Sequence, residues 1–154
     1  MKKVLVISKR EFDKVMRDNK ITAENIENRS KAAFISINDT FGTTEEPFFK
    51  EDKDNLRILF FDDVTEDTKL NWGTAKAFTK EQGKIVLEFL NKIKERDTLM
   101  VHCHAGISRS GAVGQFAADY FGLDYKEFRN LNPHIHPNST VTRILRELAR
   151  EQED

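Results

Sequence analysis

Between two predicted elements of secondary structure, the chain reads Val101-His102-Cys103-His104-Ala105-Gly106-Ile107-Ser108-Arg109-Ser110-Gly111. A predicted strand at residues 98–101 precedes this stretch, and a predicted helix at residues 110–121 follows it. At such a junction the N–H groups of the helix start are able to bind an anion. If residues 104 to 109 wrap in an arc, their N–H groups converge on one phosphate, with room left by Ala105 and Gly106. The stretch therefore predicts a phosphate-binding loop between a strand and a helix.

Strands and helices are expected to alternate on both sides of this loop. Four short apolar runs are typical of strands buried on both faces, at residues 4–7, 32–37, 56–61 and 98–101. Apolar residues recur at helical spacing in four further segments, at residues 11–17, 79–93, 110–121 and 139–152. Thr79 and Gln82 have the spacing of a capping box, and Gly122 is a plausible helix terminator. Residues 38–54 are polar and predict a loop.

This alternation predicts an α/β fold with a central, mainly parallel sheet flanked by helices. The sequence shows no internal repeat and no linker between domains, so residues 1–154 are expected to form a single domain. The apolar faces of the predicted helices are accounted for by packing within the domain. No further apolar stripe is left for contact with a second copy of the chain, which favours a monomer.

Composition narrows the classes of function. The formal net charge of −1 gives no support to a nucleic-acid partner or a membrane-surface partner. No apolar stretch approaches the length needed to cross a membrane. The single cysteine excludes a disulfide within the chain, which fits a reducing compartment, so a cytoplasmic location is expected.

Three residue types in the loop point to nucleophilic chemistry. Cys103 lies where a helix N-terminus and the cation of Arg109 both favour a thiolate, the form of cysteine that attacks. Arg109 has the planar guanidinium that holds two phosphate oxygens at once. Ser110 is placed for its hydroxyl to bond the Cys103 sulfur and help it leave. His102 is expected behind the loop, where it orients the loop without transferring protons.

The motif His102-Cys103-x-x-Gly106-x-x-Arg109-Ser110 resembles the signature of the cysteine-dependent protein tyrosine phosphatases. With Ala105 and Ser108 included, it is most similar to the dual-specificity branch and its small bacterial and phage relatives. The resemblance implies a phosphatase-like fold, a phosphocysteine intermediate on Cys103, and no metal or other cofactor. It also implies that substrate phosphate is held by the loop residues, which are His104, Ala105, Gly106, Ile107, Ser108 and Arg109.

The resemblance further implies an aspartate that protonates the leaving oxygen. In the family this residue follows the strand that precedes the long helix, and Asp63 is the best match here. Asp62 and Asp67 are close alternatives. The other histidines, His134 and His136, are expected at loops and rims because no carboxylate completes a recognisable metal-ligand spacing. The linker before the last helix contains two prolines, and Asn138 or Ser139 is expected to cap that helix.

The variable loop positions 104, 105, 107 and 108 carry neither lysine nor arginine. A pocket without extra cations is less suited to a phosphoinositide, so a phosphorylated protein or peptide is the expected partner. Phosphotyrosine is the leading substrate, with phosphoserine and phosphothreonine as additions. Two alternatives stay open, namely a non-catalytic phospho-binding module and a phosphatase for a non-protein phosphate such as a phosphoinositide or an RNA 5′-phosphate.

Overall fold

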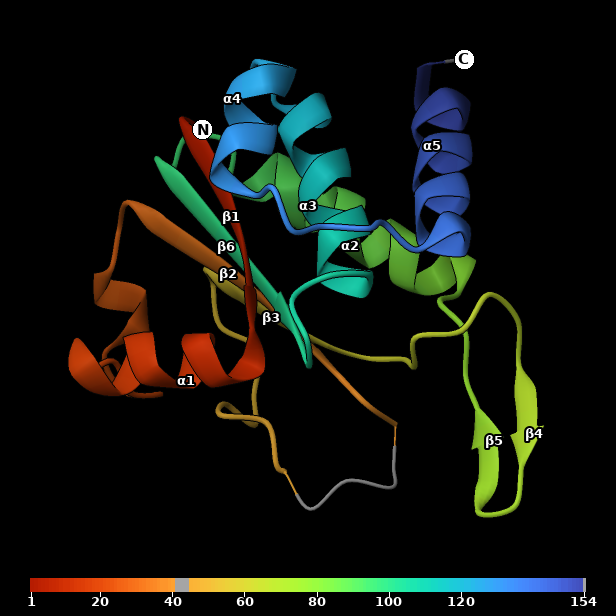
Figure 1. Ribbon diagram of the computed structural model, residues 1–154. Helices are drawn as coiled ribbons and strands as arrows, with labels where there is room; N and C mark the ends of the chain where they lie inside the picture. Colours follow the sequence, from red (N-terminus) through yellow and green to blue (C-terminus); the bar gives the residue numbers. More distant parts are fainter. Residues whose placement is uncertain (41–44, 154) are drawn as a thin grey trace.

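The computed structural model describes residues 1–40 and 45–153 (Figure 1). Its central feature is a parallel sheet of four strands in the order β1-β6-β2-β3. These strands are β1 (Lys3–Ser8), β2 (Ala32–Asn38), β3 (Leu56–Phe60) and β6 (Thr98–Cys103). The four predicted strands and the predicted α/β class with a parallel sheet are confirmed, although the last predicted strand position, Phe61, lies just beyond β3.

Helices cover both faces of this sheet (Figure 1). On one face lies α1 (Lys9–Asp18). On the other face lie α2 (Lys80–Lys92), α3 (Arg109–Tyr120), α4 (Tyr125–Leu131) and α5 (Ser139–Glu153). Alternation along β2 explains the two layers, because Ile35 and Ile37 belong to the large core with α2, α3 and α5, whereas Phe34 packs in a smaller core with Phe12 of α1.

Side-chain caps determine where two of the helices begin. The Thr79 hydroxyl accepts from the Gln82 N–H, and the Gln82 side chain accepts from the Thr79 N–H, as the sequence predicted for the start of α2. A second capping box, formed by Ser8 and Glu11, starts α1 directly at the end of β1. For this reason α1 begins two residues before the predicted start at position 11.

Three regions contain elements that periodicity did not predict, and one of them is the short 3₁₀ helix η1 (Ile26–Asn28). The short helix α4 is capped by the Asp124 carboxylate, which accepts from the Glu127 N–H. Strands β4 (Thr68–Leu70) and β5 (Gly73–Ala75) form an antiparallel hairpin. Leu70 and Trp72 of this hairpin are exposed, so no apolar alternation marks it. Of the predicted loop at residues 38–54, Asn38 belongs to β2 and residues 41–44 lie outside the described residues.

Within the part of the chain that the structure describes, no helix has both the length and the apolar composition required to cross a membrane.

Candidate active site

The residues singled out in the sequence gather at the carboxyl ends of the parallel strands. Strand β6 ends at Cys103 and α3 begins at Arg109, so the connecting residues form the predicted loop between strand and helix. We call residues 103–109 the Cys103 loop. In parallel α/β sheets this edge is where loops and helix N-termini come together around ligands.

Gly106 shapes the Cys103 loop. Its φ of +73° lies in the left-handed region, where residues with a side chain are strained. A Cβ atom at this position would also lie 2.4 Å from the backbone of Ile7 and of Ser8. The loop therefore packs directly against the junction of β1 and α1, and only glycine fits there.

Neighbouring segments bind the carbonyl groups of the loop from outside. The N–H groups of Lys9, His136 and Asn138 donate to the carbonyls of residues 104, 107 and 108, at 3.1, 2.9 and 3.0 Å. In a trans peptide the C=O and N–H groups point in opposite directions, so the amides of residues 105, 108 and 109 face the other way. The Gly106 N–H donates to the Cys103 sulfur at 3.3 Å. The loop thus has the amide arrangement of an anion cradle.

Cys103 and Ser110 lie together at the base of this cradle. The Cys103 side chain is a free thiol group and is almost fully buried. Its Sγ atom lies 3.0 Å from the Ser110 hydroxyl oxygen, which belongs to the first turn of α3. A hydroxyl and an amide that both contact one sulfur stabilise negative charge on it.

Arg109 is held by two acceptors beneath the loop. Its Nη1 atom donates to the Asp39 carboxylate at 2.7 Å and to the Phe61 carbonyl at 2.8 Å. The side chain is buried, and its Nε atom has no acceptor among the described residues. A buried guanidinium with an unused donor suits an oxyanion ligand. Sequence reasoning missed Asp39, because its proximity to Arg109 depends on the pairing of β2 with β6.

The three candidate aspartates occupy different environments. Asp63 is exposed, and its Oδ1 atom accepts from the Ser108 hydroxyl at 2.7 Å and from the Asn138 side chain at 3.0 Å. Asp67 accepts from the Ala77 N–H at 2.9 Å and lies 3.8 Å from the Lys76 ammonium. Among the described contacts, Asp63 is the candidate that bonds to the Cys103 loop.

Asp62 is a structural acceptor. Its buried carboxylate accepts from the Thr40 N–H, the Thr40 hydroxyl and the Lys76 N–H, at 3.0, 2.6 and 2.7 Å. Burial raises the pKa of this carboxyl, but the hydrogen bonds from Thr40 and Lys76 and the charge of Arg109 outweigh burial and bring the pKa below its ordinary value. A carboxylate held ionised by three donors is poorly suited to giving up a proton.

His102 lies behind the loop, where the sequence placed it. The Ser36 hydroxyl lies 2.7 Å from its Nε2 atom, and the Cys103 carbonyl lies 3.3 Å from its Nδ1 atom. Its ring packs against Phe12, with 4.3 Å between the ring centroids. Burial lowers the pKa of His102 to about 4, so the ring is neutral at neutral pH. Since a carbonyl only accepts, Nδ1 carries the proton and donates to Cys103, and Nε2 accepts from Ser36.

This buried histidine makes stability depend on pH. Because the pKa of His102 is lowered on folding, its contribution is complete above pH 6.5, the ordinary value, and is lost as pH falls through about 4. We expect the free energy of unfolding to fall by about 3 kcal/mol from this source. Urea unfolding at pH 7 and pH 4 should show that excess loss in the wild type relative to His102→Gln. Equal losses in the two proteins would contradict it.

Three further side chains of the Cys103 loop, those of His104, Ala105 and Ile107, are exposed, and His104 Nδ1 lies 3.7 Å from the Glu45 carboxylate. His134 and His136 are used elsewhere, since the ring of His134 bonds the Val6 carbonyl and the backbone of His136 bonds the loop. Within residues 1–40 and 45–153, no three or more His, Cys, Asp or Glu side chains are grouped as metal ligands.

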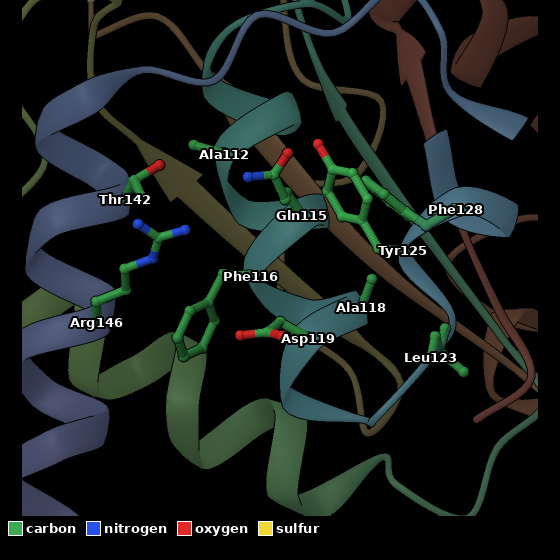
Figure 2. A pocket seen from close by; sticks show the side chains of 10 residues that line it. All are labelled: Ala112, Gln115, Phe116, Ala118, Asp119, Leu123, Tyr125, Phe128, Thr142 and Arg146. Carbon is green, nitrogen blue, oxygen red and sulfur yellow. The ribbon is translucent and has the colours of Figure 1, made fainter. Parts of the chain in front are cut away.

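One cavity of the molecule lies away from the Cys103 loop. A cavity of about 110 Å³ lies between α3, α4 and α5, with Phe116, Phe128 and Arg146 among its lining residues (Figure 2). Its lining contains no residue of the Cys103 loop. A more open hollow is lined by His104 together with residues of α1, including Lys9 and Arg10.

Comparison with known proteins bears on the fold. No family model matches this chain. No curated protein matches it either. Among solved structures, human DUSP28 aligns with a TM-score of 0.52 and 14% identity, over 98% of this chain and 95% of that chain. Human tyrosine phosphatase-like serine/threonine/tyrosine-interacting protein aligns with a TM-score of 0.47 and 18% identity, over 86% of this chain and 85% of that chain. The likeness to DUSP28 confirms the fold of the dual-specificity phosphatases, and at this identity it shows the fold alone.

Proposed function

We propose that this protein is a cysteine-dependent phosphatase that hydrolyses phosphotyrosine in proteins or peptides, with phosphoserine and phosphothreonine as further substrates. The main support for this proposal is the arrangement of hydrogen-bond donors around the Cys103 sulfur. The Ser110 hydroxyl lies 3.0 Å away, the Gly106 N–H donates at 3.3 Å, and α3 begins at Arg109, whose buried Nε atom has no acceptor among the residues that the structure describes. A thiolate nucleophile, an anion cradle and a planar cation are thereby combined in seven residues.

In the first step, the Cys103 thiolate attacks phosphorus. A bond between sulfur and phosphorus forms, and the bond from phosphorus to the tyrosine oxygen breaks. The proton of the Asp63 carboxyl goes to the departing phenolate oxygen. Arg109 and the loop amides stabilise the charge on the three non-reacting phosphate oxygens throughout this transfer.

In the second step, water attacks the phosphocysteine. The Asp63 carboxylate takes a proton from that water, and the bond between phosphorus and sulfur breaks. The Ser110 hydroxyl donates to the sulfur as negative charge returns to it. Inorganic phosphate leaves, and Cys103 is again a thiolate. No metal ion or organic cofactor enters either step.

The surroundings of the loop favour a phosphorylated protein over a lipid. The exposed positions at the opening are His104, Ala105 and Ile107, and none adds a permanent positive charge. A polyphosphorylated headgroup would find no cationic partner for its other phosphates among these three side chains. A phospho-binding module remains the second candidate, but such a role would not require Ser110 beside the sulfur, where a hydroxyl assists the leaving thiolate.

The test is steady-state hydrolysis of a phosphotyrosine peptide in the presence of a chelator. We expect turnover that the chelator leaves unchanged, that vanadate inhibits, and that proceeds through a phosphocysteine on Cys103 recoverable after rapid denaturation at alkaline pH. Peptide binding without turnover would favour the binding module. Turnover of a phosphoinositide but not of the peptide would show that the proposed substrate class is wrong.

Replacing the proposed general acid is expected to slow hydrolysis by an amount that depends on the leaving group of the substrate. Asp63→Asn should lower kcat/KM for a phosphotyrosine peptide about 100-fold or more, because the phenolate then leaves without a proton. For difluoromethylumbelliferyl phosphate, whose leaving group is a much weaker base, the loss should be small. Asp67→Asn is the matched control, because an amide oxygen still accepts from the Ala77 N–H. A selective loss in Asp67→Asn instead would reassign the acid.

A further inference from the structure

Asn138 connects three parts of the candidate site. It ends the linker between α4 and α5 and is buried, with 7% of its surface exposed. Its backbone N–H donates to the Ser108 carbonyl of the Cys103 loop at 3.0 Å. Its side-chain nitrogen donates to Asp63 Oδ1 at 3.0 Å and to the Val64 carbonyl at 3.2 Å. One residue thus contacts the phosphate cradle, the proposed acid and the start of α5.

The helix cap determines the orientation of this amide. Asn138 Oδ1 accepts from the N–H groups of Thr140 and Val141, at 3.0 and 3.1 Å. Because two backbone donors require an acceptor at that position, the amide oxygen must face α5. The amide nitrogen consequently faces Asp63. The cap of α5 therefore also determines which donor Asp63 meets.

Both donors to Asp63 act on the same oxygen. The Ser108 hydroxyl and the Asn138 amide reach Oδ1, and Oδ2 has no hydrogen-bond partner among the described residues. A protonated carboxyl that accepts two hydrogen bonds on one oxygen carries its proton on the other. This arrangement leaves Oδ2 as the oxygen able to give a proton to a substrate.

We infer that Asn138 is a positioning residue, which together with Ser108 holds Oδ1 of Asp63 so that Oδ2 donates the proton to the leaving group. This inference rests on the proposed role of Asp63 as general acid. A further contact supports it, since the Thr140 hydroxyl donates to the Thr65 carbonyl at 2.7 Å. The start of α5 therefore holds the segment that carries Asp63 at two points.

The test compares Asn138→Ser with wild type on two substrates. Serine caps a helix as well as asparagine does but does not supply the donor to Asp63. We expect kcat/KM to fall about tenfold for the phosphotyrosine peptide and less than about twofold for difluoromethylumbelliferyl phosphate. In an Asp63→Asn background, Asn138→Ser should cause no further loss, because residues that act as a unit are not additive.

Asn132→Ser is the matched control. Asn132 is a buried asparagine of the same linker, and its side chain bonds the backbone of β1 and α4 at Val6, Val4 and Phe128. Its replacement should lower the temperature of unfolding without a difference between the two substrates. If Asn138→Ser is unfolded at the assay temperature, Asn138→Thr takes its place, because threonine also caps helices and lacks the amide donor.

The possible outcomes distinguish the positioning role of Asn138 from the catalytic role of Asp63. Equal losses on both substrates, or a further loss in the Asp63→Asn background, would overturn the positioning role and leave the proposed function standing. If Asp63→Asn itself shows no difference between the substrates, the assignment of the acid is wrong and the inference falls with it. A selective loss that disappears in the Asp63→Asn background supports the inference.

Discussion

Cys103→Ser is expected to lower kcat for a phosphotyrosine peptide on the order of 10⁵-fold, which amounts to loss of measurable turnover. A hydroxyl is a far weaker acid than a thiol, so the anion that attacks phosphorus is essentially absent at neutral pH. Steady-state assays over long incubations, with a chelator present, would measure the residual rate.

The same variant should still bind the phosphopeptide. The cradle is formed by loop amides and by Arg109, and of these groups the Gly106 N–H is the one that bonds the sulfur. We expect a Kd within a few-fold of that for the wild type, measured by fluorescence anisotropy with a labelled peptide. Ser110 Oγ lies 3.0 Å from the sulfur, and a serine oxygen at position 103 is able to take up a similar hydrogen bond. Persistent turnover by Cys103→Ser would exclude the phosphocysteine mechanism.

Arg109→Lys should lower kcat about 1,000-fold. The guanidinium uses Nη1 to bond Asp39 and the Phe61 carbonyl, and its Nε atom is left for another acceptor. A lysine ammonium is a point charge without the planar fork of the guanidinium. It is therefore unable to bond the Asp39 carboxylate and the Phe61 carbonyl and also to bind two phosphate oxygens in one plane. The loss should appear mainly in kcat, because the bidentate contact strengthens as the phosphoryl group transfers.

Arg143→Lys is the control for this substitution. Arg143 is an exposed residue of α5 that pairs with Glu147 of the same helix, so the same chemical change there should leave kcat unchanged. Thermal unfolding would show whether Arg109→Lys remains folded, since the substituted ammonium would stay beside the Asp39 carboxylate. A kcat near the wild-type value in folded Arg109→Lys would contradict a role for the guanidinium in the transition state.

The parts of the candidate site that lie close together along the chain could be predicted from the sequence. Cys103, Gly106, Arg109 and Ser110 lie within eight positions, and the strand before them and the helix after them determine their relative placement. The capping box of Thr79 and Gln82 is likewise a local pattern, three residues apart. Elements with weak periodicity, such as α4 and the hairpin of β4 and β5, were not predicted, because few of their side chains enter a core.

The choice between neighbouring aspartates needed the tertiary structure. Asp62 and Asp63 are adjacent, and successive side chains of an extended segment point to opposite sides. Asp62 faces Thr40 and Lys76, whereas Asp63 faces Ser108 and Asn138. Which of the two meets the loop depends on how the segment after β3 is placed against the neighbouring strands, and a one-residue shift would exchange them.

By itself, the sequence predicted the α/β class and the position of Cys103, Arg109 and Ser110 between a strand and a helix, because both follow from side chains that are near one another along the chain. Only the tertiary structure decided the partners that hold the loop: Asp39 beneath Arg109, Ser36 behind His102, and Asn138 beside Asp63. These pairs are 66 to 75 positions apart. Their contacts arise from strand order and from the path of the linker into α5, which are consequences of packing the whole chain and leave no local pattern in the sequence.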